Sequence, residues 1–205
     1  MPPRLRSVLE SVRGVGGRLL IVAWLGLSLV GIASLGVSHT APMPRPSPEQ
    51  RLTRALLDLR ARTKEPFLVH VIYARCSCTE RLFKHLVERR ALAGMDEEIV
   101  FVGEDDAKKA RARAAGYRFT TVTPAELESR FGLQVAPVLF AFTPEGRLAY
   151  AGGYFDRPAA VVALDQRIVS DVEHGVDAQP LPVYGCAVSP ELQKSVDPLG
   201  IVYRN

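Results

Sequence analysis

The sequence predicts an α/β protein, a three-layer sandwich with a mixed central sheet, preceded by one N-terminal transmembrane helix. Short apolar, β-branched runs alternate with segments whose apolar residues recur at helical spacing, which is typical of strands between helices. The last two strand-like runs are joined by the turn Pro144-Glu145-Gly146, which predicts an antiparallel hairpin at one edge of the sheet. A long uncharged run near the N-terminus stands apart from this pattern.

The composition is that of a globular protein, and its basic charge is concentrated at the N-terminus. The chain has 205 residues, of which 47% are hydrophobic and 23% charged. Residues 1–44 contain four arginines and one glutamate, a balance of +3, so the remaining chain carries only +1 of the net charge of +4. A folded part with so little net charge lacks the field that attracts phosphates, which argues against a nucleic-acid partner.

The N-terminal run Leu19–Val37 contains no charged residue and is long enough to cross a bilayer as a helix. Arginines precede it and none follows until Arg45, so the positive-inside rule puts residues 1–18 in the cytoplasm. We therefore predict that residues 19–37 form a transmembrane or signal-anchor helix and that the remaining chain is periplasmic or otherwise extracytoplasmic. The alternative is a cleaved signal peptide.

Three further segments follow the predicted anchor: a proline-rich linker over residues 38–49, a folded domain over residues 50–175 and a C-terminal strap over residues 176–205. Ser77 and Glu80 fit a capping box, so Ser77 is the expected N-cap of the second helix of the domain. The expected elements are helices at Ser47–Thr63, Leu82–Val87, Asp105–Ala115, Thr123–Arg130 and Pro158–Val172, and strands at Phe67–Tyr73, Glu98–Val102, Val135–Thr143 and Arg147–Ala151.

The three cysteines carry the strongest chemical signal. Cys76 and Cys78 lie where the first strand gives way to a helix, and exposed N–H groups at a helix start favour the thiolate form, as does the charge of Arg75. Three cysteines are too few for a disulfide-stapled scaffold. Cys186 lies among prolines and glycine in the C-terminal strap, either near the pair or remote from it. The alternative for the pair is two inert buried side chains.

The order of elements, with a cysteine pair after the first core strand, resembles the thioredoxin-like superfamily. Within it the chain resembles envelope redoxins of the TlpA and RedB groups, which have a C-x-C-[ST] turn and a late V-[FY]-G-C stretch. The residues that carry the resemblance are Cys76-Ser77-Cys78-Thr79, Val183-Tyr184-Gly185-Cys186, Ala136-Pro137-Val138 and Gly152-Gly153.

This resemblance implies an envelope thiol–disulfide oxidoreductase that exchanges disulfides with protein thiols and needs neither a cofactor nor a metal. Cys76, which lies further out along the turn, is the expected nucleophile, and Cys78 would resolve the mixed disulfide. Pro137 would be cis and opposite the pair, with Ala136 and Arg75 contacting the substrate. Cys186 would act as a third redox partner if it packs near the turn.

Three other readings of the same residues remain open. Soft thiolates in a C-x-C pair, with Cys186, suit Cu(I), and His174 is the one histidine placed late enough to join them. A peroxidase would need a P-x-x-x-[TS]-x-x-C pattern that is absent before either cysteine of the pair. The chain would otherwise be a non-enzymatic binding module of this fold. His70 is expected to be a core histidine and His85 to face outward.

Overall fold

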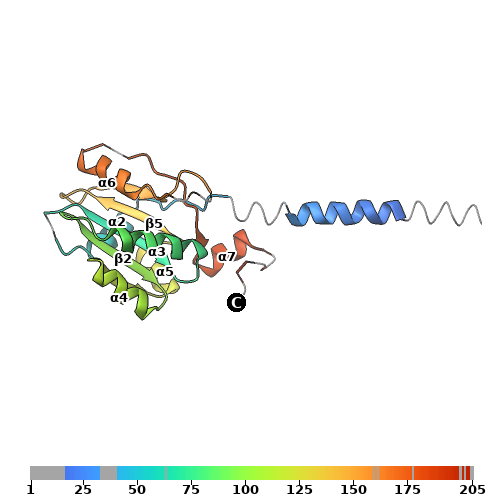
Figure 1. Cartoon of the computed structure of the whole chain (residues 1–205), viewed down its shortest axis with the longest axis horizontal. Coiled ribbons are helices and arrows are strands. Elements are labelled where there is room, and N and C mark those ends of the chain that lie inside the picture. The colour runs from blue at the N-terminus through green and yellow to red at the C-terminus, as the bar shows by residue number, and fades with distance from the viewer. Residues whose placement is uncertain are drawn as a thin grey trace, which may run out of the picture. The chain divides into compact units, whose positions relative to one another are not determined.

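Figure 1 shows the computed structural model, which describes residues 17–32, 41–62, 64–158, 160, 162–176, 178–198, 200 and 202–203. The chain forms two units, Met1–Thr40 and Ala41–Asn205. In the first unit residues 17–32 are helical. Within the described part of the chain, no helix is both long and apolar enough to span a bilayer. The end of the predicted span 19–37 and most of the basic segment 1–18 lie outside the described residues, so the anchor stays a prediction.

The second unit is built on a five-stranded sheet. Its strands are β1 (Phe67–Tyr73), β2 (Asp96–Val102), β3 (Arg118–Val122), β5 (Val138–Phe142) and β6 (Leu148–Gly152), in the order β3-β2-β1-β5-β6. The first three strands pair in parallel, whereas β5 is antiparallel to both β1 and β6. The predicted mixed sheet with an antiparallel hairpin at its edge is therefore confirmed.

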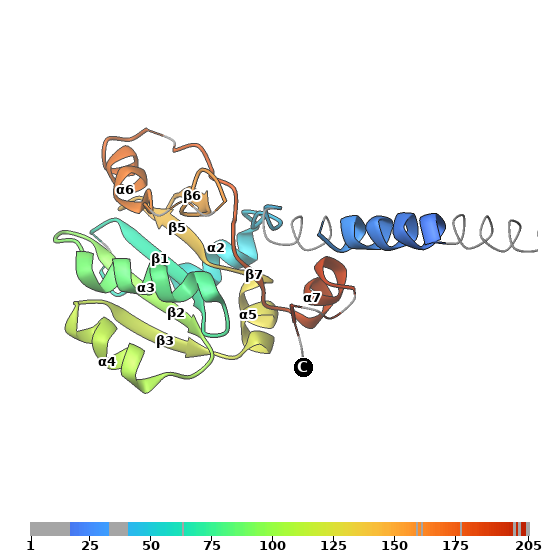
Figure 2. The ribbon, with the colours of Figure 1, turned by 45° about the vertical axis from the view of Figure 1, so that its right-hand side comes forward.

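Helices cover both faces of this sheet and make the predicted three layers (Figure 2). On one face, α2 (Gln50–Leu57) and α5 (Pro124–Phe131) contribute apolar side chains to the core cluster that also contains Cys76. On the other face, α3 (Ser77–Arg89), α4 (Asp106–Ala114) and α6 (Asp165–Glu173) pack their apolar residues against the sheet. The domain is a three-layer α/β sandwich with a mixed central sheet, as the sequence predicts.

The structure differs from the predicted elements in three places: one strand was not predicted, one predicted strand is interrupted, and one helix begins later. The missed strand β3 lies at the sheet edge, where Phe119 and Val122 are buried and its other residues are partly or fully exposed. The expected single strand Val135–Thr143 is divided at Pro137 into β4 (Val135–Ala136) and β5. The last helix of the domain begins at Asp165, seven residues after Pro158, where it was expected to start.

The helix starts show which capping predictions hold. Cys76, not Ser77, is the N-cap of α3, and the helix begins at Ser77. The backbone turns one residue earlier than the capping box implied, because the N–H of Thr79 already donates to the carbonyl of Cys76. The C-terminal strap contains β7 (Cys186–Ala187) and, after it, α7 (Pro190–Val196), a helix capped by the hydroxyl of Ser189.

A buried ion network holds the C-terminal end of α3. The guanidinium of Arg89 lies between two carboxylates, with its Nη2 2.7 Å from Glu97 and its Nε 2.9 Å from Asp165. His70 contacts Glu97 and His85 contacts Asp165, each at 2.8 Å. His70 is a core histidine, as predicted. The prediction that His85 faces outward is wrong, because its ring is only 33% exposed and is held by Asp165 of α6.

Candidate redox site

Cys76 lies at the start of α3, where the chain leaves β1, and its side chain is buried. Its sulfur is joined in a disulfide to Cys186, with 110 positions of sequence between them and 5.8 Å between the two Cα atoms. Cys76 Sγ also lies 4.0 Å from the carbonyl oxygen of Ala136. The structure therefore brings Cys186 to the predicted site, and the cysteine bonded to Cys76 is Cys186 and not Cys78.

Cys186 reaches this position because its segment pairs with the strand before Pro137. The strand β7 runs antiparallel to β4, with Cys186 opposite Ala136 and Ala187 opposite Val135. One residue further, the N–H of Val188 donates to the carbonyl of Gln134 at 2.7 Å. The peptide bond between Ala136 and Pro137 is cis, as predicted.

The segment before Cys186 is anchored to the domain at two further places. The N–H of Gly153 donates to the carbonyl of Leu181 at 3.1 Å, and the N–H of Met43 donates to the carbonyl of Val183 at 2.8 Å. Val183 is fully buried. Backbone hydrogen bonds thus hold the C-terminal strap to the linker, to the end of β6 and to β4. Together they determine the position of Cys186.

Cys78 lies in the first turn of α3, half-buried and outside the disulfide. The phenol of Tyr203 accepts a hydrogen bond from the N–H of Ala187 at 2.8 Å. Burial raises the pKa of Tyr203, and the nearby Tyr73, Asp197 and Cys78 act in the same direction. Tyr203 thus holds its segment against β7, the strand that carries Cys186.

Arg75 is adjacent to Cys76 in the chain, whereas His174 lies at the end of another helix. Arg75 is exposed in the turn just before Cys76, where its charge lies beside the start of α3. His174 follows α6, and its Nδ1–H donates to the carbonyl of Ser170 at 2.7 Å. Among the residues that the structure describes, no three His, Cys, Asp or Glu side chains are grouped as metal ligands.

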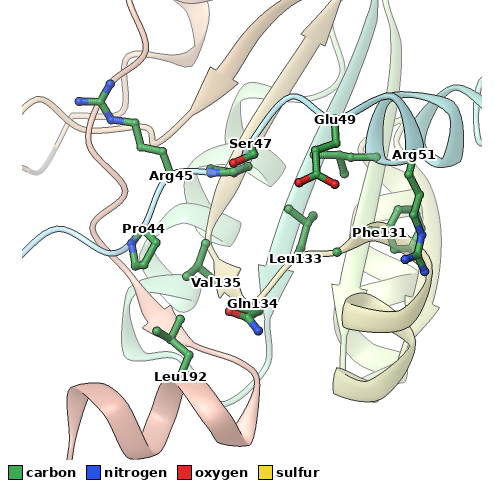
Figure 3. A pocket seen from close by; sticks show the side chains of 13 residues that line it. Pro44, Arg45, Ser47, Glu49, Arg51, Phe131, Leu133, Gln134, Val135 and Leu192 are labelled. Carbon is green, nitrogen blue, oxygen red and sulfur yellow. The ribbon is translucent and has the colours of Figure 1, made fainter.

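A cavity of about 230 Å³ lies beside β4, at the meeting point of three segments of the chain. Figure 3 shows Pro44 of the linker, Val135 of β4 and Leu192 of α7 around it. The three cysteines are not among its lining residues. The cavity therefore adjoins the redox site through Val135 without opening onto the sulfurs.

Sequence reasoning missed the two features that close the site, Tyr203 and the pairing of β7 with β4. Tyr203 had no signal, because it is two residues from the end of the chain, outside any periodic segment. The pairing had a partial signal in the glycine before Cys186. A side chain there would meet the carbonyl of Ala136, and glycine is the residue that permits such close backbone approach.

Comparisons with known proteins identify similar folds. No family model matches the chain, and no curated protein matches it. A hypothetical protein from Sinorhizobium meliloti is 22% identical with a TM-score of 0.50, covering 62% of this chain and 80% of its own. A peroxiredoxin-like protein from Aquifex aeolicus is 14% identical, with a TM-score of 0.40 and coverage of 57% and 75%. StoA from Bacillus subtilis is 12% identical, with a TM-score of 0.35 and coverage of 51% and 80%.

Proposed function

We propose that this protein is a membrane-anchored thiol–disulfide oxidoreductase of the cell envelope that exchanges disulfides with partner proteins through Cys76 and Cys78. The supporting observation is that the sulfur of Cys76, at the start of a helix, is joined to a cysteine carried on an extended segment beside β4. A disulfide of Cys76 can be opened by thiol–disulfide exchange, and the helix start stabilises the Cys76 thiolate that is released.

In the reducing direction, the thiolate of Cys76 attacks one sulfur of a partner disulfide. The partner disulfide breaks, its second sulfur leaves as a thiolate that takes up a proton, and a mixed disulfide with Cys76 forms. The thiolate of Cys78 then attacks Cys76 Sγ and releases the first partner sulfur. The partner has gained two electrons, the Cys76–Cys78 disulfide has formed, and a dithiol donor must return two electrons. Oxidation of a partner dithiol is the same sequence reversed.

Two groups would hold the partner during these steps. The backbone of Ala136 faces the segment that carries Cys186, so an extended partner segment can pair with it there. Arg75, exposed beside Cys76, would attract thiolates and acidic residues of the partner. We propose that the exchange needs no cofactor, and stoichiometric Cu(I) binding by the reduced protein would instead support the copper-handling alternative.

Residues 19–37 would hold the domain at the membrane, with residues 1–18 in the cytoplasm and the domain on the outer side. The support is the uncharged run and the arginines that precede it. An oxidising compartment outside the cytoplasm also suits a protein with a disulfide. Cysteine labelling of intact cells with a membrane-impermeant reagent would test this orientation, since labelling of Cys78 only after lysis would contradict it.

The function is tested by trapping and by turnover on a defined disulfide protein such as insulin. Because Cys186 can also reach Cys76, the trap is the double variant Cys78→Ser with Cys186→Ser, in which the mixed disulfide with Cys76 should persist and appear as a covalent adduct. In the Cys76→Ser variant both adduct and insulin reduction should be lost. Lys84→Ala, an exposed change on the same helix, is the matched control and should keep full turnover. Equal turnover in Cys76→Ser and in the control would reject the proposal.

A further inference from the structure

The segment Gly185–Val188 lies along β4 in the position that a bound peptide would occupy. Its cysteine is bonded to Cys76, and the residues around that cysteine pair with Gln134, Val135 and Ala136 through the backbone. A partner cysteine that forms a mixed disulfide with Cys76 brings its own main chain equally close, because only one methylene separates sulfur from Cα. The available backbone partner is then the same short strand.

We propose that the C-terminal strap is an internal substitute for the partner's cysteine segment, and that it occupies the backbone edge of β4 where the proposed function places that segment. We further infer that the edge selects a segment with glycine immediately before its cysteine and small apolar residues after it. This inference depends on the proposed function, since it names the class of substrate for the same cysteine pair.

The preference for glycine follows from the contact at Gly185. A Cβ added to Gly185 would lie 2.2 Å from the carbonyl oxygen of Ala136 and 2.7 Å from Cδ of Pro137. Both atoms belong to backbone or ring and to a buried part of the chain, so neither moves aside easily. A partner segment in the same register meets the same two groups, and any residue larger than glycine at this position would be forced away from β4.

The preference for small apolar residues follows from burial on the other side of the cysteine. Ala187 is completely buried, and Val188 is 2% exposed and belongs to the core cluster that includes Val135. A charged side chain at either position would be removed from water without a partner of opposite charge on β4. The sequence Gly-Cys-Ala-Val is therefore the pattern that this edge accepts.

Attack by Cys78 breaks the bond that holds the C-terminal strap at β4. Its thiolate attacks Cys76 Sγ, the Cys76–Cys186 bond breaks, and Cys186 leaves as a thiolate that takes up the proton lost by Cys78. One disulfide replaces another, so no external oxidant or reductant is needed. A partner thiolate can then attack Cys76 Sγ and expel Cys78, and its segment takes the place of Gly185–Val188.

The test uses the reduced full-length Cys186→Ser variant and two peptides, Gly-Cys-Ala-Val and Ala-Cys-Ala-Val, each with its cysteine in a mixed disulfide with thionitrobenzoate. The part of the thionitrobenzoate release that is lost when Cys76 is also replaced by serine gives the rate of attack by Cys76, because Cys78 is a second free thiol. The rate with glutathione corrects for the intrinsic reactivity of each peptide. We expect the glycine peptide to react at least about tenfold faster, because the extra methyl group overpacks a buried contact. Both peptides should react more slowly with the reduced wild type, where the C-terminal strap competes.

The outcomes separate this inference from the proposed function. Equal corrected rates for the two peptides, or a faster alanine peptide, would overturn the docking preference and leave thiol exchange by Cys76 standing. If neither peptide reacts and the symmetrical thionitrobenzoate disulfide also fails to react, the exchange function itself is wrong, and the inference is wrong with it.

The same contact can be tested inside the chain. In the Gly185→Ala variant the C-terminal strap should be forced from β4, and mass mapping of the air-oxidised protein should find Cys76 joined to Cys78 instead of Cys186. Ala187→Gly changes one methyl group on the same segment without adding atoms, so it should keep the Cys76–Cys186 disulfide. A Gly185→Ala protein with an unchanged Cys76–Cys186 disulfide would contradict the inference.

Discussion

The two ends of α3 are held in different ways. At its C-terminal end, Arg89 is fixed between Glu97 and Asp165 by buried ion pairs. At its N-terminal end, Cys76 is held by a disulfide and by neighbouring backbone pairing, both of which can be exchanged. One end therefore sets the position of the helix, so that the other end can change its covalent partner without moving the helix.

The largest expected effect comes from removing the covalent link at the N-terminal end. Because the Cys76–Cys186 disulfide closes a loop of more than a hundred residues, Cys186→Ala should lower the free energy of unfolding of the oxidised protein by about 5 kcal/mol. Urea unfolding measures this. Excess reductant should bring the wild type close to the variant, and Cys78→Ser should lose far less. If reductant left the stability of the wild type unchanged, the claim that the disulfide stabilises the N-terminal end of α3 would be wrong.

The next effect comes from the C-terminal end of α3. Replacing Arg89 by Met leaves the carboxylates of Glu97 and Asp165 buried without their shared cation, which should cost about 3–5 kcal/mol in unfolding free energy. The matched change on the same helix is Lys84→Ala, which breaks an exposed pair with Glu88 and should cost less than about 1 kcal/mol. Equal losses in the two variants would show that the buried network does not hold the helix.

The acid sensitivity of the domain should also originate at this end. Burial by itself would raise the pKa of Glu97, but hydrogen bonds from His70 and Arg89 outweigh it and lower the pKa from 4.5 to about 2. A carboxylate whose pKa is lower in the folded state stabilises that state at pH values above its unfolded-state pKa. This stabilisation is lost as the pH falls toward the folded-state pKa. Glu97 should therefore contribute on the order of 3 kcal/mol above pH 4.5, and lose it between about pH 4.5 and 2.

Stability measured against pH for wild type and Glu97→Gln tests this, since the difference between the two curves should shrink as pH falls through that range. Glu98 provides the contrast, because burial raises its pKa and its contribution has the opposite sign. Glu98→Gln should remove a term that favours folding at low pH. A Glu97→Gln curve parallel to the wild type would contradict the assignment.

The smallest effect concerns the helix that leads into β4. Thr123 and Glu126 form a capping box at the start of α5, and the loop after this helix carries Gln134 to the edge of β4. Thr123→Ala should cost about 1 kcal/mol in unfolding free energy. It should leave the Cys76–Cys186 disulfide intact in mass mapping. Ser189→Ala is the matched change beside β7, because it removes a side-chain cap of the same kind at the start of α7. A loss of the disulfide in Thr123→Ala would show that the edge depends on α5.

Much of the fold follows from local patterns in the sequence. The runs at Phe67–Tyr73 and Glu98–Val102 are apolar and β-branched because both faces of those strands are covered, so they could be recognised without knowing their partners. The sheet edge β3 could not, since Thr120 and Thr121 are polar and mask the strand period. The helix Pro158–Val172 was extended too far toward its N-terminus, because apolar residues before Asp165 pack in a loop.

The sequence alone determined that Cys76 and Cys78 start a helix after a buried strand, since this depends on residues adjacent in the chain. Only the tertiary structure decided that Cys76 is bonded to Cys186 and that Tyr203 is hydrogen-bonded to Ala187 beside it. Cys76 is bonded to Cys186 because the backbone at Ala136 pairs with a segment fifty positions away. A contact of this kind produces no periodic pattern in the sequence. The distance between the two sulfurs is set by the packing of the whole domain, whereas the helix start is set by its nearest neighbours.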